Sequence, residues 1–247
     1  MANWSDPRPG LAPVGAATDA RGVAYDAGLR AYMLSVYNYM ASAVLLTGIV
    51  AMGVFYSGAY TALISQTGLS PLGWVVAFAP LGIVFAMSFG QNRMSTGTLQ
   101  LLFWAYATLL GASFSTLFLA YANSSIAGAF FATAAGFAAL SLYGYTTERN
   151  LSAMGSFLIV GLVGLIVAML VNVFLHSGPL SLIISVVGVL IFAGLTAYDT
   201  QRTKSIYSYV AGTESEGRAK IMSALNLYLD FINMFLFILR LFGSSRN

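Results

Sequence analysis

The sequence predicts an all-α integral membrane protein, a bundle of seven transmembrane helices. Of its 247 residues, 58% are hydrophobic and only 8% are charged, whereas about a quarter of the residues of a soluble domain are charged. So few charged groups cannot coat a water-facing globule of this size, and the apolar surplus must therefore face lipid. The alternation of apolar and polar residues that marks an outer-membrane barrel is absent, which leaves helices as the spanning structure.

The chain divides into a polar segment and a membrane domain. Residues 1–30 are polar and rich in Gly, Pro and Ala. Because they lack the basic start and apolar core of a secretory signal, we expect a flexible cytoplasmic N-terminal tail. Residues 31–247 form the predicted seven-helix domain, in which each apolar run of about twenty residues covers a hydrocarbon core of about 30 Å. The predicted spans are Tyr32–Ser57, Leu72–Phe89, Gly97–Tyr121, Ile126–Tyr145, Ala153–Leu175, Pro179–Tyr198 and Ser223–Phe242.

The connections between the spans predict the orientation of the chain. Lys and Arg residues lie in the tail and in the second, fourth and sixth loops, and the first, third and fifth loops have none. Cytoplasmic loops carry the excess of positive charge, so we expect a cytoplasmic N-terminus and a multi-pass protein of the bacterial inner membrane. The C-terminus would then lie outside, with Arg240 and Arg246. Either the seventh span does not cross fully, or these arginine side chains reach back to the interface.

The charge and the residue types exclude several classes of function. The net charge is +3, but the basic residues are spread over the connections and form no patch for nucleic acid. The chain has no Cys and one His, His176, which excludes disulfides, thiol chemistry and the usual zinc sites. We therefore expect no cofactor, and the lipid bilayer as the main surrounding.

Two carboxylates lie in or against apolar runs. Asp199 ends the sixth span in the stretch LTAYDTQ, and Asp230 lies inside the seventh span in NLYLDFINMF. A charged side chain at the centre of a spanning helix costs about 2.5–3.5 kcal/mol on insertion scales, so such residues are expected to be functional. For Asp199, a position at the water interface is the alternative interpretation.

The seventh span also carries a polar face around Asp230. Asn226 and Asn233 lie on the same side of the predicted helix, with Ser223 and Arg240 further along it. A polar face on a membrane helix should point into the bundle. We therefore predict that the seventh helix is central and that the other helices surround it.

The two aspartates can meet if the sixth helix continues past its apolar part to about Tyr209. The segment TQRTKSIYSYV contains no Gly or Pro, and so permits this continuation. Two adjacent carboxylates in a medium of low dielectric constant cannot both ionise cheaply, so they would share a proton. Such a pair would sense pH and, with both protons lost, would bind a hard cation such as Ca²⁺ transiently.

The motif LYLDFINMFLFILRLFG, with AYDTQ one helix earlier, resembles the paired signature of the Bax inhibitor-1 (transmembrane Bax inhibitor motif) family, in its bacterial members. The resemblance covers the chain from about Leu29 onward. It implies six helices around a central last helix, and a pH-sensitive calcium leak in which Asp199 and Asp230 open or close the cytoplasmic end of a pore. It also implies a basic latch at the end of the second span, where Gly90 aligns and Arg93 is the candidate. An anchor at the membrane surface is the alternative role for Arg93.

Two other functions compete with the channel. The resemblance also suggests, for some bacterial members, a regulator or interaction partner in membrane protein quality control. It would bind a membrane protease or another membrane protein through the tail and the sixth loop. An intramembrane aspartyl protease would likewise use two aspartates on consecutive helices, but the seventh span reads LYLD in place of GxGD and no Pro-Ala-Leu segment follows. We therefore predict a channel and not an enzyme.

Overall fold

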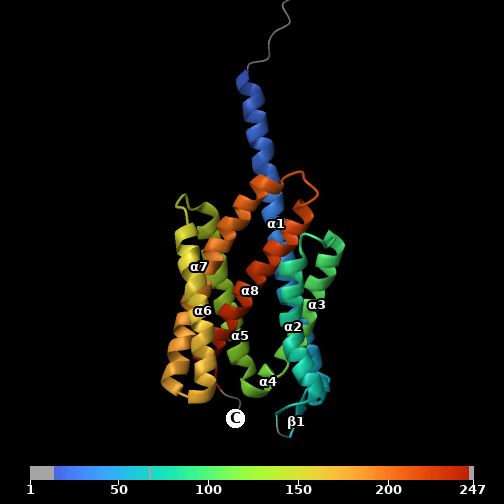
Figure 1. Cartoon of the computed structure of the whole chain (residues 1–247), viewed down its shortest axis with the longest axis vertical. Helices are drawn as coiled ribbons and strands as arrows, with labels where there is room; N and C mark the ends of the chain where they lie inside the picture. Colours follow the sequence, from blue (N-terminus) through green and yellow to red (C-terminus); the bar gives the residue numbers. More distant parts are fainter. Residues whose placement is uncertain (1–13, 67, 245–247) are drawn as a thin grey trace, which may run out of the picture.

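The protein is a bundle of long helices in the computed structural model, which describes residues 14–66 and 68–244 (Figure 1). Within these residues, seven helical segments are long and apolar enough to cross a membrane. This confirms the predicted fold class. The elements are α1 (Val14–Tyr56), α2 (Pro71–Gly90), α3 (Thr96–Phe114), α4 (Leu117–Ala120), α5 (Asn123–Thr146), α6 (Ser152–Leu175), α7 (Gly178–Val210) and α8 (Glu216–Phe242).

The first loop holds the short strands of the described chain. A 3₁₀ turn, η1 (Ala59–Ala62), precedes β1 (Ile64–Ser65), which pairs antiparallel with β2 (Gly68–Leu69). The third predicted span is divided into α3 and α4. At the division the hydroxyls of Ser115 and Thr116 donate to the carbonyl oxygens three residues earlier, at 2.6 and 2.9 Å. Such side-chain bonds compete with the helical pattern of the backbone, and the helix breaks there.

Helix α1 begins much earlier than the predicted start of the first span at Tyr32. It starts at Val14, so residues 14–30, which we predicted as tail, continue the helix. This segment is rich in alanine and contains no proline, so the residues favour helix once the spanning part has formed. Residues 1–13 of the predicted tail lie outside the described residues.

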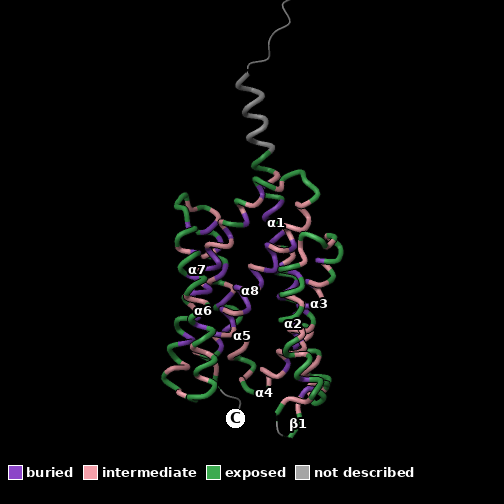
Figure 2. The backbone as a smooth tube through the Cα atoms, viewed as in Figure 1, coloured by how far each residue is buried: buried purple, intermediate pink, exposed green. Residues whose placement is uncertain are grey.

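Helix α8 is the central element, as predicted. Of its most apolar stretch, 67% is buried inside the bundle, against 44% for α7 and less for each of the other spans. The main partners of α8 are α1, α3, α5 and α7, whereas α2 packs on α3 and α6 packs on α7 in an outer layer. Figure 2 shows the buried residues concentrated on the inner faces, around α8.

A buried hydrogen-bond junction joins α8 to α1 and α3. The Tyr228 hydroxyl lies 2.6 Å from Thr47 Oγ1, which lies 2.9 and 3.1 Å from the carbonyl oxygens of Ala43 and Ala107. The single hydroxyl proton of threonine is donated to a carbonyl oxygen, so Tyr228 donates to Thr47. Both side chains are buried, so the Tyr228 hydroxyl depends on Thr47 for an acceptor that water cannot replace.

We expect Thr47→Val to lower the free energy of unfolding by about 1–2 kcal/mol, because it leaves the Tyr228 hydroxyl without its acceptor. The measurement is the midpoint of thermal unfolding in detergent micelles. Thr108→Val is the matched control, since Thr108 is exposed and its hydroxyl bonds only within its own helix, to the Trp104 carbonyl. Equal midpoints for the two variants would show that the junction contributes nothing to stability.

Candidate functional site

Helix α7 continues well past its apolar part and so brings Asp199 to the depth of Asp230. It ends at Val210, twelve residues after the predicted end of the span at Tyr198. At about 1.5 Å per residue, Asp199 lies about 17 Å from the end of α7, and Asp230 lies about 21 Å from the start of α8 at Glu216. The continuation of α7 past Tyr198, on which the predicted contact of the two aspartates depends, is therefore present.

The carboxyl groups of Asp199 and Asp230 are in direct contact. The two side chains lie close enough to act on each other directly, and two carboxyl groups can form a hydrogen bond with each other only when one of them carries a proton. Asp230 is 4% exposed, and no donor among the described residues bonds to its buried Oδ2 atom. Asp199 is half-buried. The pair thus has one member that is almost fully buried and one member that is half-buried.

A cavity of about 460 Å³ adjoins the pair between α6, α7 and α8. Its polar lining comes from α7 and α8, and its third wall, from α6, is apolar. Asn226 and Asn233, the predicted supporting residues, both line it. Asn233 donates from Nδ2 to the Leu229 carbonyl oxygen at 2.8 Å, so its Oδ1 atom is the amide atom available to a ligand. The polar and charged side chains that line the cavity include Asp199, Arg202, Asn226, Asp230, Asn233 and Arg240.

Ser223 was predicted on the same polar face, but it lies against another helix. It is buried, and its hydroxyl is 3.5 Å from the hydroxyl of Tyr32 in α1. Near Ser223, α1 packs on α8 and covers the polar face of α8. Asp230 lies on the same face two turns further along the helix. Ser223 therefore belongs to the packing between α1 and α8 and not to the cavity.

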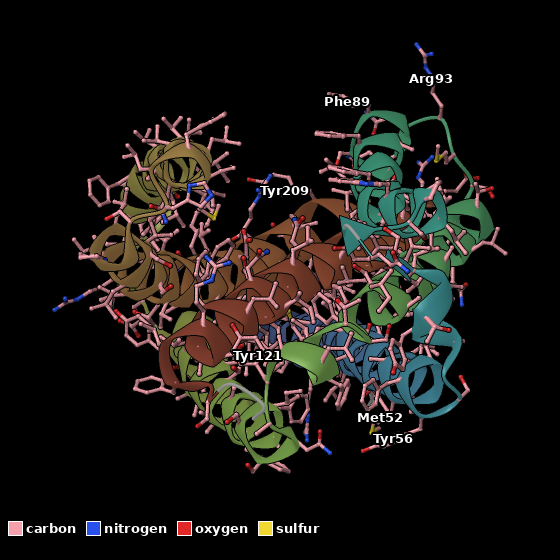
Figure 3. The ribbon with its side chains drawn as sticks, turned by 90° about the horizontal axis from the view of Figure 1, so that it is seen from below. Met52, Tyr56, Phe89, Arg93, Tyr121 and Tyr209 are labelled. Carbon is pink, nitrogen blue, oxygen red and sulfur yellow. The ribbon has the colours of Figure 1, made fainter. Side chains whose placement is uncertain are left out.

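Arg93, the candidate latch, is not near the aspartates. It lies in the turn between α2 and α3, it is exposed, and Figure 3 shows its side chain pointing away from the bundle. Helix α2 packs mainly on α3, which holds this turn at the periphery. In this conformation Arg93 makes no ion pair with Asp199, the residue that a latch would have to hold.

Arg202 is the cation that acts on Asp199, whereas the sequence alone indicates only a basic residue of the sixth loop. It lies three residues after Asp199, and its charge acts on the Asp199 carboxylate. Arg202 lines both the 460 Å³ cavity and a second cavity of about 650 Å³ that opens at the end of α7. The i, i+3 spacing on a continuous helix was the available signal, but it applies only if α7 continues past Tyr198.

The site offers too few ligands for a tight metal centre. No group of three or more His, Cys, Asp or Glu residues is found in the part of the chain that the structure describes. Ca²⁺ takes six to eight oxygen ligands, and here two carboxylates and two amide side chains face the same cavity. Water would have to complete the coordination of a Ca²⁺ ion at this cavity.

The comparisons with known proteins agree with the fold and extend over nearly the whole chain. The model of the family described as "Inhibitor of apoptosis-promoting Bax1" matches residues 29–247. An uncharacterized protein of Rickettsia prowazekii is 48% identical over 93% of this chain and 96% of its own length. The inner membrane protein YbhL of Escherichia coli K12 is 40% identical over 89% of this chain and 94% of its own length.

Proposed function

Because the chain belongs to the Bax inhibitor-1 family, we propose that it is a pH-sensitive calcium-permeable leak channel gated by Asp199 and Asp230. The observation that carries the proposal is the contact between these two carboxyl groups beside a cavity, with Asp230 almost fully buried. A bacterial inner-membrane location is proposed with it, and the name of the Escherichia coli relative, inner membrane protein YbhL, supports that location.

The gating step follows from the charge of the pair. With one shared proton, the two carboxyl groups together carry a single negative charge. When that proton leaves, the two carboxylates repel each other, and two unit charges about 4 Å apart repel by about 4 kcal/mol at an effective dielectric constant of about 20. A divalent cation or a separation of α7 from α8 relieves this repulsion. The proton and the cation therefore compete for the position between the two carboxyl groups. Whether either of them is bound there decides whether α7 and α8 stay together or separate.

The proposed orientation places the pair near the cytoplasmic mouth. The ends of α2 and α7 lie at the end of the bundle from which α1 extends (Figure 1). Arg93 and Arg202 lie at this end, which the excess of positive charge assigns to the cytoplasm. The second cavity, of about 650 Å³, opens there and shares Tyr198 and Arg202 with the cavity beside the aspartates.

Calcium flux into liposomes tests the proposal. The purified full chain is reconstituted into vesicles loaded with a calcium-sensitive dye, and the rate of dye response is recorded between about pH 6 and pH 8, the range of physiological proton switches. We expect a rate above that of empty vesicles that changes across this range. A rate equal to that of empty vesicles at every pH would remove the channel function.

The position of Arg93 gives a second expected result. Because its side chain points away from the bundle, Arg93→Gln should leave the dependence of calcium flux on pH unchanged. The same liposome assay measures it, with the wild type in parallel. A large change in the pH profile of this variant would mean that α2 moves toward α7 during gating and that Arg93 then reaches Asp199.

A further inference from the structure

A long apolar groove runs between α1 and α5, away from the aspartates. The main partners of α1 are α3 and α8, and those of α5 are α7 and α8, so α1 and α5 flank α8 without packing closely on each other. A cavity of about 970 Å³ lies between them, and Phe231 of α8 forms its floor. A second cavity, of about 390 Å³, continues the groove and shares Val44, Leu45, Phe130 and Phe231 with the first.

The two cavities each have the length of one leaflet. From Arg30 to Leu45, α1 rises about 22 Å, and from Leu45 to Tyr56 it rises about 17 Å. Half of a bilayer is about 15 Å thick in its hydrocarbon core and about 20–22 Å thick with its headgroup region. The residues shared by the two cavities thus lie near the middle of the membrane. Met52 and Tyr56, which line the second cavity, point outward from the bundle in Figure 3, on the side that faces lipid.

The two ends of the groove differ in charge. At the first end stands Arg30, whose exposed side chain forms no ion pair with another described residue. Lys204 lies next to this end, outside the groove: it donates to the Tyr145 carbonyl oxygen at 3.1 Å and lies 5.1 Å from the centre of the Tyr145 ring, and Tyr145 lines the groove. Lys204 itself lines the neighbouring cavity of about 650 Å³, with Asp26 and Glu148, so Arg30 is the basic residue in the lining of the groove. At the other end the polar groups are neutral, with Asn123 donating to the Tyr56 hydroxyl at 3.2 Å.

We propose that the first cavity of this groove binds an anionic phospholipid, with its phosphate at Arg30 and its acyl chain between α1 and α5. The apolar walls fit an acyl chain, the length fits one leaflet, and the positive end lies where the headgroup of that leaflet would be. A guanidinium group binds phosphate through paired N–H donors, and a basic pocket between membrane helices is a recognised site for anionic headgroups.

Native mass spectrometry of the full chain tests the headgroup contact. The protein is released from vesicles of equal phosphatidylglycerol and phosphatidylcholine content, and the retained lipids are counted. We expect the wild type to retain phosphatidylglycerol preferentially, and Arg30→Gln to lower this preference about tenfold, since one charge-assisted contact is lost. Arg93→Gln is the matched control, because it removes an exposed arginine from the same end of the bundle but outside the groove.

A second pair of variants tests the acyl chain. Ala138 is exposed and lines the groove, whereas the neighbouring Ala139 is exposed but does not line it. Ala138→Trp should therefore reduce the retained lipid, and Ala139→Trp should not. Equal retention of phosphatidylglycerol by the wild type and Arg30→Gln would overturn the proposal.

The same position tests whether another copy of the chain fills the groove. Because the chain has no cysteine, Ala138→Cys gives a single reactive position. Disulfide-linked dimers of this variant in native membranes would identify a second copy as the occupant and would overturn the lipid site. Absence of such dimers, together with the expected lipid retention, supports it.

Discussion

Asp230→Asn should abolish the dependence of calcium flux on pH, so that the flux at about pH 6 and at about pH 8 becomes equal. The amide cannot ionise, and it donates a permanent hydrogen bond to Asp199 where the carboxyl pair would hold an exchangeable proton. Asp230 is almost fully buried, and no donor among the described residues satisfies its Oδ2 atom. The one event that the substitution removes is therefore the loss and gain of the shared proton.

Glu216→Gln is the control for this result. It also removes a carboxylate from α8, but Glu216 lies at the start of the helix and pairs with Lys220 at 2.7 Å. A surface pair of this kind contributes little to stability, so the flux of this variant should keep its pH profile. If Asp230→Asn kept the wild-type profile as well, the proton switch would have to lie at another residue.

Gly144→Val should destabilise the fold by about 3 kcal/mol, because it forces two helices apart. A Cβ atom at Gly144 in α5 would collide with the backbone of Ala197 in α7. Backbone atoms cannot move aside as a flexible side chain can, so α5 and α7 must separate. This contact lies two residues before Asp199, and its loss would also displace that carboxyl group from Asp230.

Thermal unfolding in detergent measures this effect, with Gly136→Val as the matched control. Gly136 lies on the same helix, eight residues earlier, and a Cβ atom there would meet nothing within 4 Å. The control should unfold near the wild-type temperature, and Gly144→Val should unfold well below it. Similar temperatures for the two variants would mean that α5 and α7 are not closely packed at this point.

The sequence predicts most of the fold because a bilayer restricts the choices. Backbone groups in the hydrocarbon core must be satisfied within helices, so each apolar run becomes one span. The ends of α2, α5 and α6 accordingly lie within a few residues of the predictions. The continuation of α7 could also be inferred, since the residues after Tyr198 contain no helix breaker. The contact between Asp199 and Asp230 depends on that continuation.

The remaining features depend on packing that one sequence does not reveal. Whether Arg93 or Arg202 faces Asp199 is decided by α2, which packs on α3 and leaves Arg93 at the periphery. Ser223 has the spacing of the polar face, but α1 covers it. The groove between α1 and α5 has no sequence signature, because its walls have the same apolar residues as any surface that faces lipid.

Infrared spectroscopy of the reconstituted protein tests the shared proton most directly. The carbonyl stretch of a protonated carboxylic acid is separate from that of a carboxylate, and it reports the proton whatever ion the channel carries. We expect a protonated-acid band in the wild type at neutral pH that disappears as the pH rises and is absent from Asp230→Asn. A wild-type spectrum without this band at neutral pH, or a band that persists in Asp230→Asn, would contradict it.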